Sequence, residues 1–87
     1  MKTYVTFGQD HVHVIENAET GERLVFDKDC VASIEANSRI EGRNKAFDLF
    51  GPKFSMEYFE KEFNEKDSLC FFKRGVLAVP TSFNILT

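Results

Sequence analysis

Several short stretches in the first half of the chain alternate between apolar and polar residues with a period of two, which is typical of strands with one buried face. The pattern predicts strands over Thr3–Phe7, His11–Ile15, Arg23–Phe26 and Cys30–Ala36. Within the last of these, alternation separates two sets of side chains. The set expected to face the core is Cys30, Ala32, Ile34 and Ala36. The set expected to face away is Val31, Ser33 and Glu35.

A helix is predicted over residues 39–50, because its start and its stop are both signalled. Ser38 and Glu41 have the spacing of a capping box, in which side chains satisfy free backbone N–H groups of the first turn. Gly51 tolerates the left-handed backbone that ends helices, and Pro52 cannot continue one. The apolar stripe expected to pack on a sheet is Ile40, Ala46, Phe47, Leu49 and Phe50.

Gly42 stands inside this predicted helix, where it costs on the order of 1 kcal/mol relative to alanine. Either the cap and the packing offset this cost, or another segment approaches closely at Gly42. Arg43, Asn44, Lys45 and Asp48 are expected to face solvent.

The second half has less regular patterns. Alternation predicts a strand over residues 54–58, and residues 59–66 fit either a short second helix or a loop. Two apolar arms, residues 69–72 and 76–79, flank a basic turn and predict a terminal hairpin. The uncharged tail, residues 81–87, either packs loosely on the domain or offers an exposed apolar segment.

These elements predict a single α+β domain over residues 1–87, in which a mainly antiparallel sheet of four to six short strands packs against one helix. A chain of 87 residues buries too little surface for two independent cores. Its ten phenylalanines suggest that aromatic rings supply much of the core volume, and some of them are candidates for a partner surface.

Composition narrows the functional classes. The net charge of −3 argues against nucleic acid as a direct ligand, because phosphate affinity needs concentrated positive charge. The opening residues become polar too soon for a signal peptide, and no apolar run approaches the length of a membrane span, so we expect a cytoplasmic protein. In that setting Cys30 and Cys70 are expected to be free thiols rather than a disulfide.

Motifs for catalysis are missing from the sequence, and we predict neither an enzyme nor a bound cofactor. His11 and His13 lie two apart on a predicted strand and would share a face, a spacing that can place two imidazoles on one metal. Two histidines are an incomplete ligand set, and the alternative is a solvent-facing polar pair. Asp10, or Asp27 and Asp29 across a turn, could add oxygen ligands. No metal site is predicted, and His11 and His13 are the candidate ligands if one exists.

Two charged segments are candidates for binding a partner. Acidic residues are concentrated at Glu57, Glu60, Glu62, Glu65 and Asp67. This array could bind a partner protein whose own basic surface binds nucleic acid. The alternative is a solvated helix face with local Glu–Lys pairs. Lys73 and Arg74 form a basic turn that could contact phosphate or an acidic patch, and Arg43 adds a cation on the helix.

Several strings in the chain resemble a group of short proteins encoded in bacterial phages and prophages. They are Thr3–Gln9, His11–His13, Phe26–Ala32, Ile34–Ala36, Gly42–Arg43, Ala46–Phe47 and Phe50–Phe54, within residues 3–74. The relatives have a shorter loop where this chain has Glu16–Val25. The resemblance implies a phage or prophage gene rather than a particular mechanism.

Three functional hypotheses follow. The first is a non-enzymatic phage accessory protein that binds a host protein, by analogy with anti-CRISPR and other anti-defence inhibitors of similar size. The second is a small nucleic-acid-associated phage protein that uses Arg39, Arg43, Lys45 and the Lys73–Arg74 turn. The third is a metal-binding domain built on His11 and His13. The sequence leaves the oligomeric state open, with a homodimer among the candidate states.

Overall fold

The computed structural model describes residues 1–64, 66 and 72–86. Within them the chain forms seven strands, one α-helix and one short 3₁₀ helix, which confirms the predicted α+β class. In chain order the elements are β1 (Lys2–Thr6), β2 (His13–Asn17), β3 (Arg23–Phe26), β4 (Cys30–Glu35), α1 (Arg39–Phe50), β5 (Met56–Phe59), η1 (Glu60–Glu62), β6 (Gly75–Ala78) and β7 (Phe83–Ile85).

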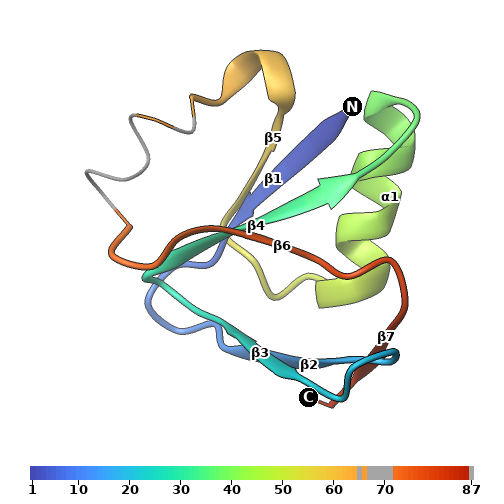
Figure 1. The fold of residues 1–87 in the computed structure, drawn as a ribbon. Coiled ribbons are helices and arrows are strands. Elements are labelled where there is room, and N and C mark those ends of the chain that lie inside the picture. The colour runs from blue at the N-terminus through green and yellow to red at the C-terminus, as the bar shows by residue number, and fades with distance from the viewer. Residues whose placement is uncertain (65, 67–71, 87) are drawn as a thin grey trace.

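The strands form two sheets rather than the single sheet predicted. The first has the order β5-β1-β4-β6, and the second has the order β3-β2-β7. All pairings are antiparallel except β4 with β6. Figure 1 shows α1 beside the four-stranded sheet, with the three-stranded sheet below both.

Only the second arm of the predicted terminal hairpin can be compared with the structure, because residues 69–71 of the first arm lie outside the described residues. Its second arm is β6, which pairs in parallel with β4, a strand more than 40 residues earlier in the chain. Alternation cannot reveal such a long-range partner, since it reports only which face of a strand is buried.

One core joins the helix-facing side of the first sheet, the second sheet and the C-terminal half of α1. Its buried members are Val5, Phe7, Ile15, Phe26, Cys30, Ala32, Ile34, Ala46, Leu49 and Phe50. The rings of Phe7 and Phe50 meet edge to face with their centroids 4.9 Å apart, and Phe26 contacts both. Part of the phenylalanine excess is therefore core.

β4 is buried on both faces, which the alternation in its sequence did not predict. Cys30, Ala32 and Ile34 face the core as expected, but Val31 and Ser33 are buried as well. Ser33 lies opposite Tyr4 of β1, and the ring of Phe63 stacks on Tyr4 at a centroid distance of 4.5 Å. The chain after β5 thus covers the second face of the sheet.

The Ser38 cap and the Gly51 stop of α1 are confirmed, whereas the Glu41 side chain pairs with Lys45 instead of completing the capping box. Ser38 Oγ accepts a hydrogen bond from the Glu41 N–H at 3.1 Å, which satisfies one free donor of the first turn. At the other end Gly51 has a φ of 60° and donates its N–H to Phe47 O at 2.8 Å.

The predicted apolar stripe of α1 is wrong in two positions, because the helix is rotated about its axis. Ile40 is 73% exposed and Phe47 is 44% exposed. The face that packs on β1 and β4 carries Gly42, Ala46, Leu49 and Phe50 instead. Small residues at the contact allow the helix axis to approach the sheet more closely, and this places the larger side chains of Ile40 and Phe47 in solvent.

Of the two alternatives predicted for the tail, packing on the domain holds for Phe83–Ile85, which forms β7 and pairs with β2. The start of β2 differs from the prediction. β2 begins at His13 instead of His11.

Candidate partner-binding surface

Three of the five residues of the predicted acidic array lie within the described residues, on the consecutive elements β5 and η1. Glu57 lies on β5, where its Oε2 is buried with no hydrogen-bond partner among the described residues. Glu60 and Glu62 belong to η1, and Glu62 forms an ion pair with Arg39 at 2.9 Å. Glu65 and Asp67 lie outside the described residues.

The basic turn is tied to the protein itself. Arg74 donates through Nη1 to Val25 O at 2.6 Å, and the same nitrogen lies 3.4 Å from Asp27 Oδ1. Its backbone N–H donates to Asp29 O at 2.7 Å. Arg74 thereby holds the start of β6 against the β3–β4 turn, and Lys73 beside it is exposed.

The two histidines lie in different environments, His13 in the core and His11 nearer the surface. His13 is buried between Phe7 and Phe50, with ring centroids 5.7 and 4.9 Å away. Its Nε2 lies 2.6 Å from Lys53 O, and because a carbonyl oxygen only accepts, Nε2 carries the proton and donates. His11 precedes β2 and is half-buried.

Neither sequence interpretation of this pair, a shared strand face or a solvent-facing pair, describes His13. A buried imidazole between two rings fills core volume, and its hydrogen bond fixes the turn after α1. Among the described residues, no three His, Cys, Asp or Glu side chains gather as a metal-binding group.

A continuous aromatic and basic surface lies on the outer face of α1. We call it the Phe47 patch and define it as Arg39, Ile40, Arg43, Phe47 and Phe54. Four of these residues are on α1, spaced so that they share one side of the helix. The Phe54 ring, just before β5, meets the Phe47 ring in a T-shaped contact with centroids 5.2 Å apart.

Both arginines of the Phe47 patch lie over aromatic rings. The guanidinium carbon of Arg43 is 5.8 Å from the centroid of Phe47, and that of Arg39 is 5.9 Å from the centroid of Phe59 on β5. Such cation–π contacts hold a guanidinium flat against a ring while its N–H groups remain able to bind a partner.

The charge of the Phe47 patch is unequal at its two ends. Arg39 is neutralised by Glu62, whereas no carboxylate of the described residues forms an ion pair with Arg43. Lys45, one helical turn away from Glu41, is held by that carboxylate at 3.1 Å and by Glu35 O at 2.9 Å. Arg43 is therefore the cation best placed to meet an acidic group of a partner.

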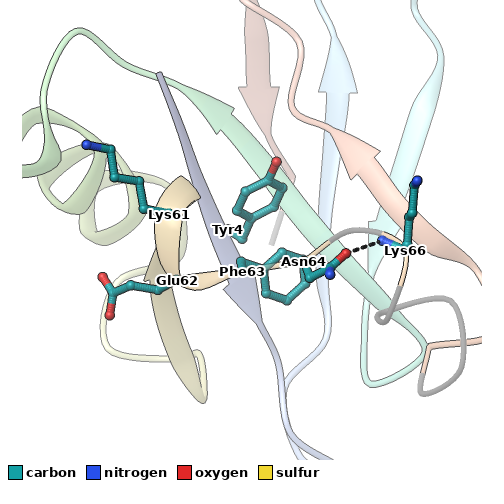
Figure 2. A pocket seen from close by; sticks show the side chains of 6 residues that line it. All are labelled: Tyr4, Lys61, Glu62, Phe63, Asn64 and Lys66. Atoms are coloured by element: carbon teal, nitrogen blue, oxygen red, sulfur yellow. Dashed lines mark hydrogen bonds between the residues drawn. The ribbon is translucent and has the colours of Figure 1, made fainter.

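A second surface feature is a hollow of about 640 Å³ beside η1, shown in Figure 2. The stacked rings of Tyr4 and Phe63 form part of its wall, and the Lys66 N–H donates to Asn64 Oδ1 at 2.9 Å. The Glu62 side chain points away from these rings, consistent with its ion pair to Arg39. Among the described residues, Glu62 is the one member of the predicted acidic array that lines this hollow.

Comparison of the chain with protein-family models, with curated proteins and with solved structures finds no match. Among the described residues, no helix has the length and apolar character needed to cross a membrane.

Sequence patterns identified Arg43 but not the aromatic residues around it. Ile40 and Phe47 are spaced like core residues of a helix, and only the close packing of Gly42 against β1 shows that they face outward. The signal available in the sequence was Gly42 itself, since a glycine in a helix often marks the side that approaches another element.

Proposed function

We propose that this chain is a non-enzymatic phage or prophage accessory protein that acts in the host cytoplasm by binding a host protein, as anti-defence inhibitors do. The observation that carries the proposal is the Phe47 patch, where a large aromatic ring and an aliphatic side chain are exposed beside two arginines. The resemblance to phage-encoded proteins supplies the setting.

The composition of the Phe47 patch suits protein binding. Aromatic residues and arginine are enriched at protein interfaces, and an aromatic ring buries a large apolar area there. The Phe47 ring contacts both the Phe54 ring and the Arg43 guanidinium, so it is partly ordered before a partner arrives.

The same contacts define the chemistry of the partner. An apolar group of the partner would pack on Ile40 and Phe47, and a carboxylate would meet Arg43. A nucleic acid is a poorer match, since Arg39, Lys45 and Arg74 all pair with acceptors of this protein and the net charge is −3.

Affinity capture from host lysate, followed by titration of the purified captured protein, tests the proposal. We expect Phe47→Asp to weaken binding by 2 kcal/mol or more, roughly 30-fold, and Arg43→Glu to weaken it as well. The matched control is Val12→Asp, a variant at another exposed apolar position, 58% exposed, which should bind like the wild type.

Two results would contradict the proposal. One is a captured protein whose affinity is the same for Phe47→Asp and for Val12→Asp. The other is recovery of nucleic acid alone, together with direct DNA or RNA binding that weakens steeply as salt is raised, which would favour the nucleic-acid hypothesis instead.

A further inference from the structure

The core of the protein is open at the edge formed by β7. Ile85 lies opposite Ile15 in the antiparallel β2–β7 pair, so the two side chains share a face of the sheet. Ile15 is 1% exposed, yet Ile85 on the same face is 51% exposed. A side chain that points to the core side therefore remains largely in solvent.

This opening is a groove of about 520 Å³ between β7 and the C-terminal half of α1. Its apolar walls include Ile34, Leu49, Val79, Phe83 and Ile85. Charges of both signs, Glu35, Lys45 and Asp48, also line it. A surface that carries both signs can pair with an identical copy of itself across a twofold axis.

β7 is also an edge strand, with β2 as its only neighbour among the described residues. The Ala18 N–H donates to Ser82 O, and the Leu86 N–H donates to Val14 O, both at 3.0 Å. In antiparallel pairing the backbone groups of successive residues alternate between the two sides of a strand. The N–H and C=O groups of Phe83 and Ile85 consequently point away from β2, toward the open edge.

We propose that this edge pairs with the β7 strand of a second copy of the chain, which closes the groove and forms a twofold dimer. Each hydrogen-bonded pair between the copies must join two residues whose backbone groups point outward. In one register both outward-pointing residues of each copy are paired. Phe83 then lies opposite Ile85 of the partner subunit, with Asn84 on the twofold axis. This register joins the two three-stranded sheets into one sheet of six strands.

The side chains agree with that register. Phe83 and Ile85 are on the core face, so the twofold register forms two phenylalanine–isoleucine cross-strand pairs, each with one residue from each copy, and they cover the groove mouths. Asn84 falls on the opposite face of the sheet, where it is exposed and would lie beside its symmetry mate. The dimer contact is made by β7 and does not involve the Phe47 patch. The dimer proposal is therefore independent of the proposed function.

A cysteine at the axis tests the register directly. Non-hydrogen-bonded antiparallel positions have Cα atoms about 4.5 Å apart, within the range of about 4.4–6.8 Å that a disulfide spans. In a Cys70→Ser background, we expect Asn84→Cys to form a covalent dimer under mild oxidation. Arg23→Cys, at an exposed position on β3 at the opposite edge of the same sheet, should remain monomeric on a denaturing gel.

Sedimentation equilibrium provides the second measurement. We expect the wild type to dimerise with increasing concentration, and Ile85→Asp to stay monomeric with an unchanged far-UV spectrum. Val25→Asp, on β3, should dimerise like the wild type. A wild type that is monomeric throughout, a dimer that survives Ile85→Asp, or equal cross-linking of Asn84→Cys and Arg23→Cys would overturn the proposal. If Ile85→Asp fails to fold, the cysteine pair still decides the question.

Discussion

At the scale of single residues, the contact between Gly42 and Thr3 decides how α1 lies on the sheet. A Cβ atom built at Gly42 would lie 1.9 Å from Thr3 Oγ1 and 2.9 Å from Thr3 Cβ, closer than real Cβ atoms come. Thr3 is fully buried, and its Oγ1 has no hydrogen-bond partner in the described structure. The contact is therefore tight, and it brings the helix close to β1 at the position where glycine has no side chain.

Gly42→Ala should consequently destabilise the protein, although alanine favours a helix by about 1 kcal/mol. Overpacking at a buried contact costs roughly 1–3 kcal/mol, so after the helix-propensity gain we expect a net loss of up to about 2 kcal/mol in urea denaturation. Thr3→Ala should recover part of the loss in the double variant, because it removes the nearer clashing atom. Asn44→Ala, at an exposed helix position, should be neutral or slightly stabilising. A stabilised Gly42→Ala variant would show that the contact is loose.

Cys30 gives a second prediction, for pH dependence. Burial raises the pKa of the Cys30 thiol above its ordinary value, opposed by the hydrogen bond from the Asp27 backbone and by the charge of Arg74. The unfolded chain therefore loses this proton first as pH rises, so the folded state is favoured less above the unfolded thiol pKa of about 8.5.

The free energy of unfolding should accordingly fall more steeply between pH 8 and 10 for the wild type than for Cys30→Ala, with the other titrating groups common to both. Urea denaturation at several pH values measures this difference. A difference between the two proteins that stays constant across the range would contradict a raised thiol pKa.

At the scale of elements, the sequence predicts segments with their own local signals and misses those defined by distant partners. α1 has a cap, a stop and an apolar face, and its bounds of Arg39–Phe50 are as predicted. β6 and β7 acquire their roles from pairing with β4 and β2, which lie far away in the chain. The rotation of α1, and with it the exposure of Phe47, depends on the same kind of distant contact.

The N-terminal cap of α1 provides the element-scale prediction. Removal of the Ser38 hydroxyl leaves the Glu41 N–H without its acceptor, so Ser38→Ala should cost about 1 kcal/mol in thermal or urea denaturation. Ser38→Asp should retain the stability, since a carboxylate also accepts this bond and suits the positive end of the helix dipole. Ser55→Ala, at an exposed serine outside α1, is the control and should change little. Equal losses for Ser38→Ala and Ser55→Ala would mean that the cap contributes no stability.

At the scale of the whole molecule, two incompletely covered surfaces share no residue, although both include part of α1. The Phe47 patch is on the outer face of α1, and the groove lies between β7, at the edge of the three-stranded sheet, and the C-terminal half of α1. If each copy in a twofold dimer retains its own Phe47 patch, one dimer presents two binding sites. Two sites on one assembly would raise the apparent affinity for a partner that is itself multivalent.

Hydrogen exchange of the chain with and without its captured host protein shows whether the Phe47 patch is the binding surface. We expect partner binding to slow exchange in residues 39–47 and around Phe54, and to leave β3 unchanged. Phe47→Asp should abolish this protection at concentrations where Val12→Asp retains it. Protection confined to β7, to η1 or to the Lys73–Arg74 turn, with residues 39–47 unaffected, would contradict the claim that the Phe47 patch is the binding surface.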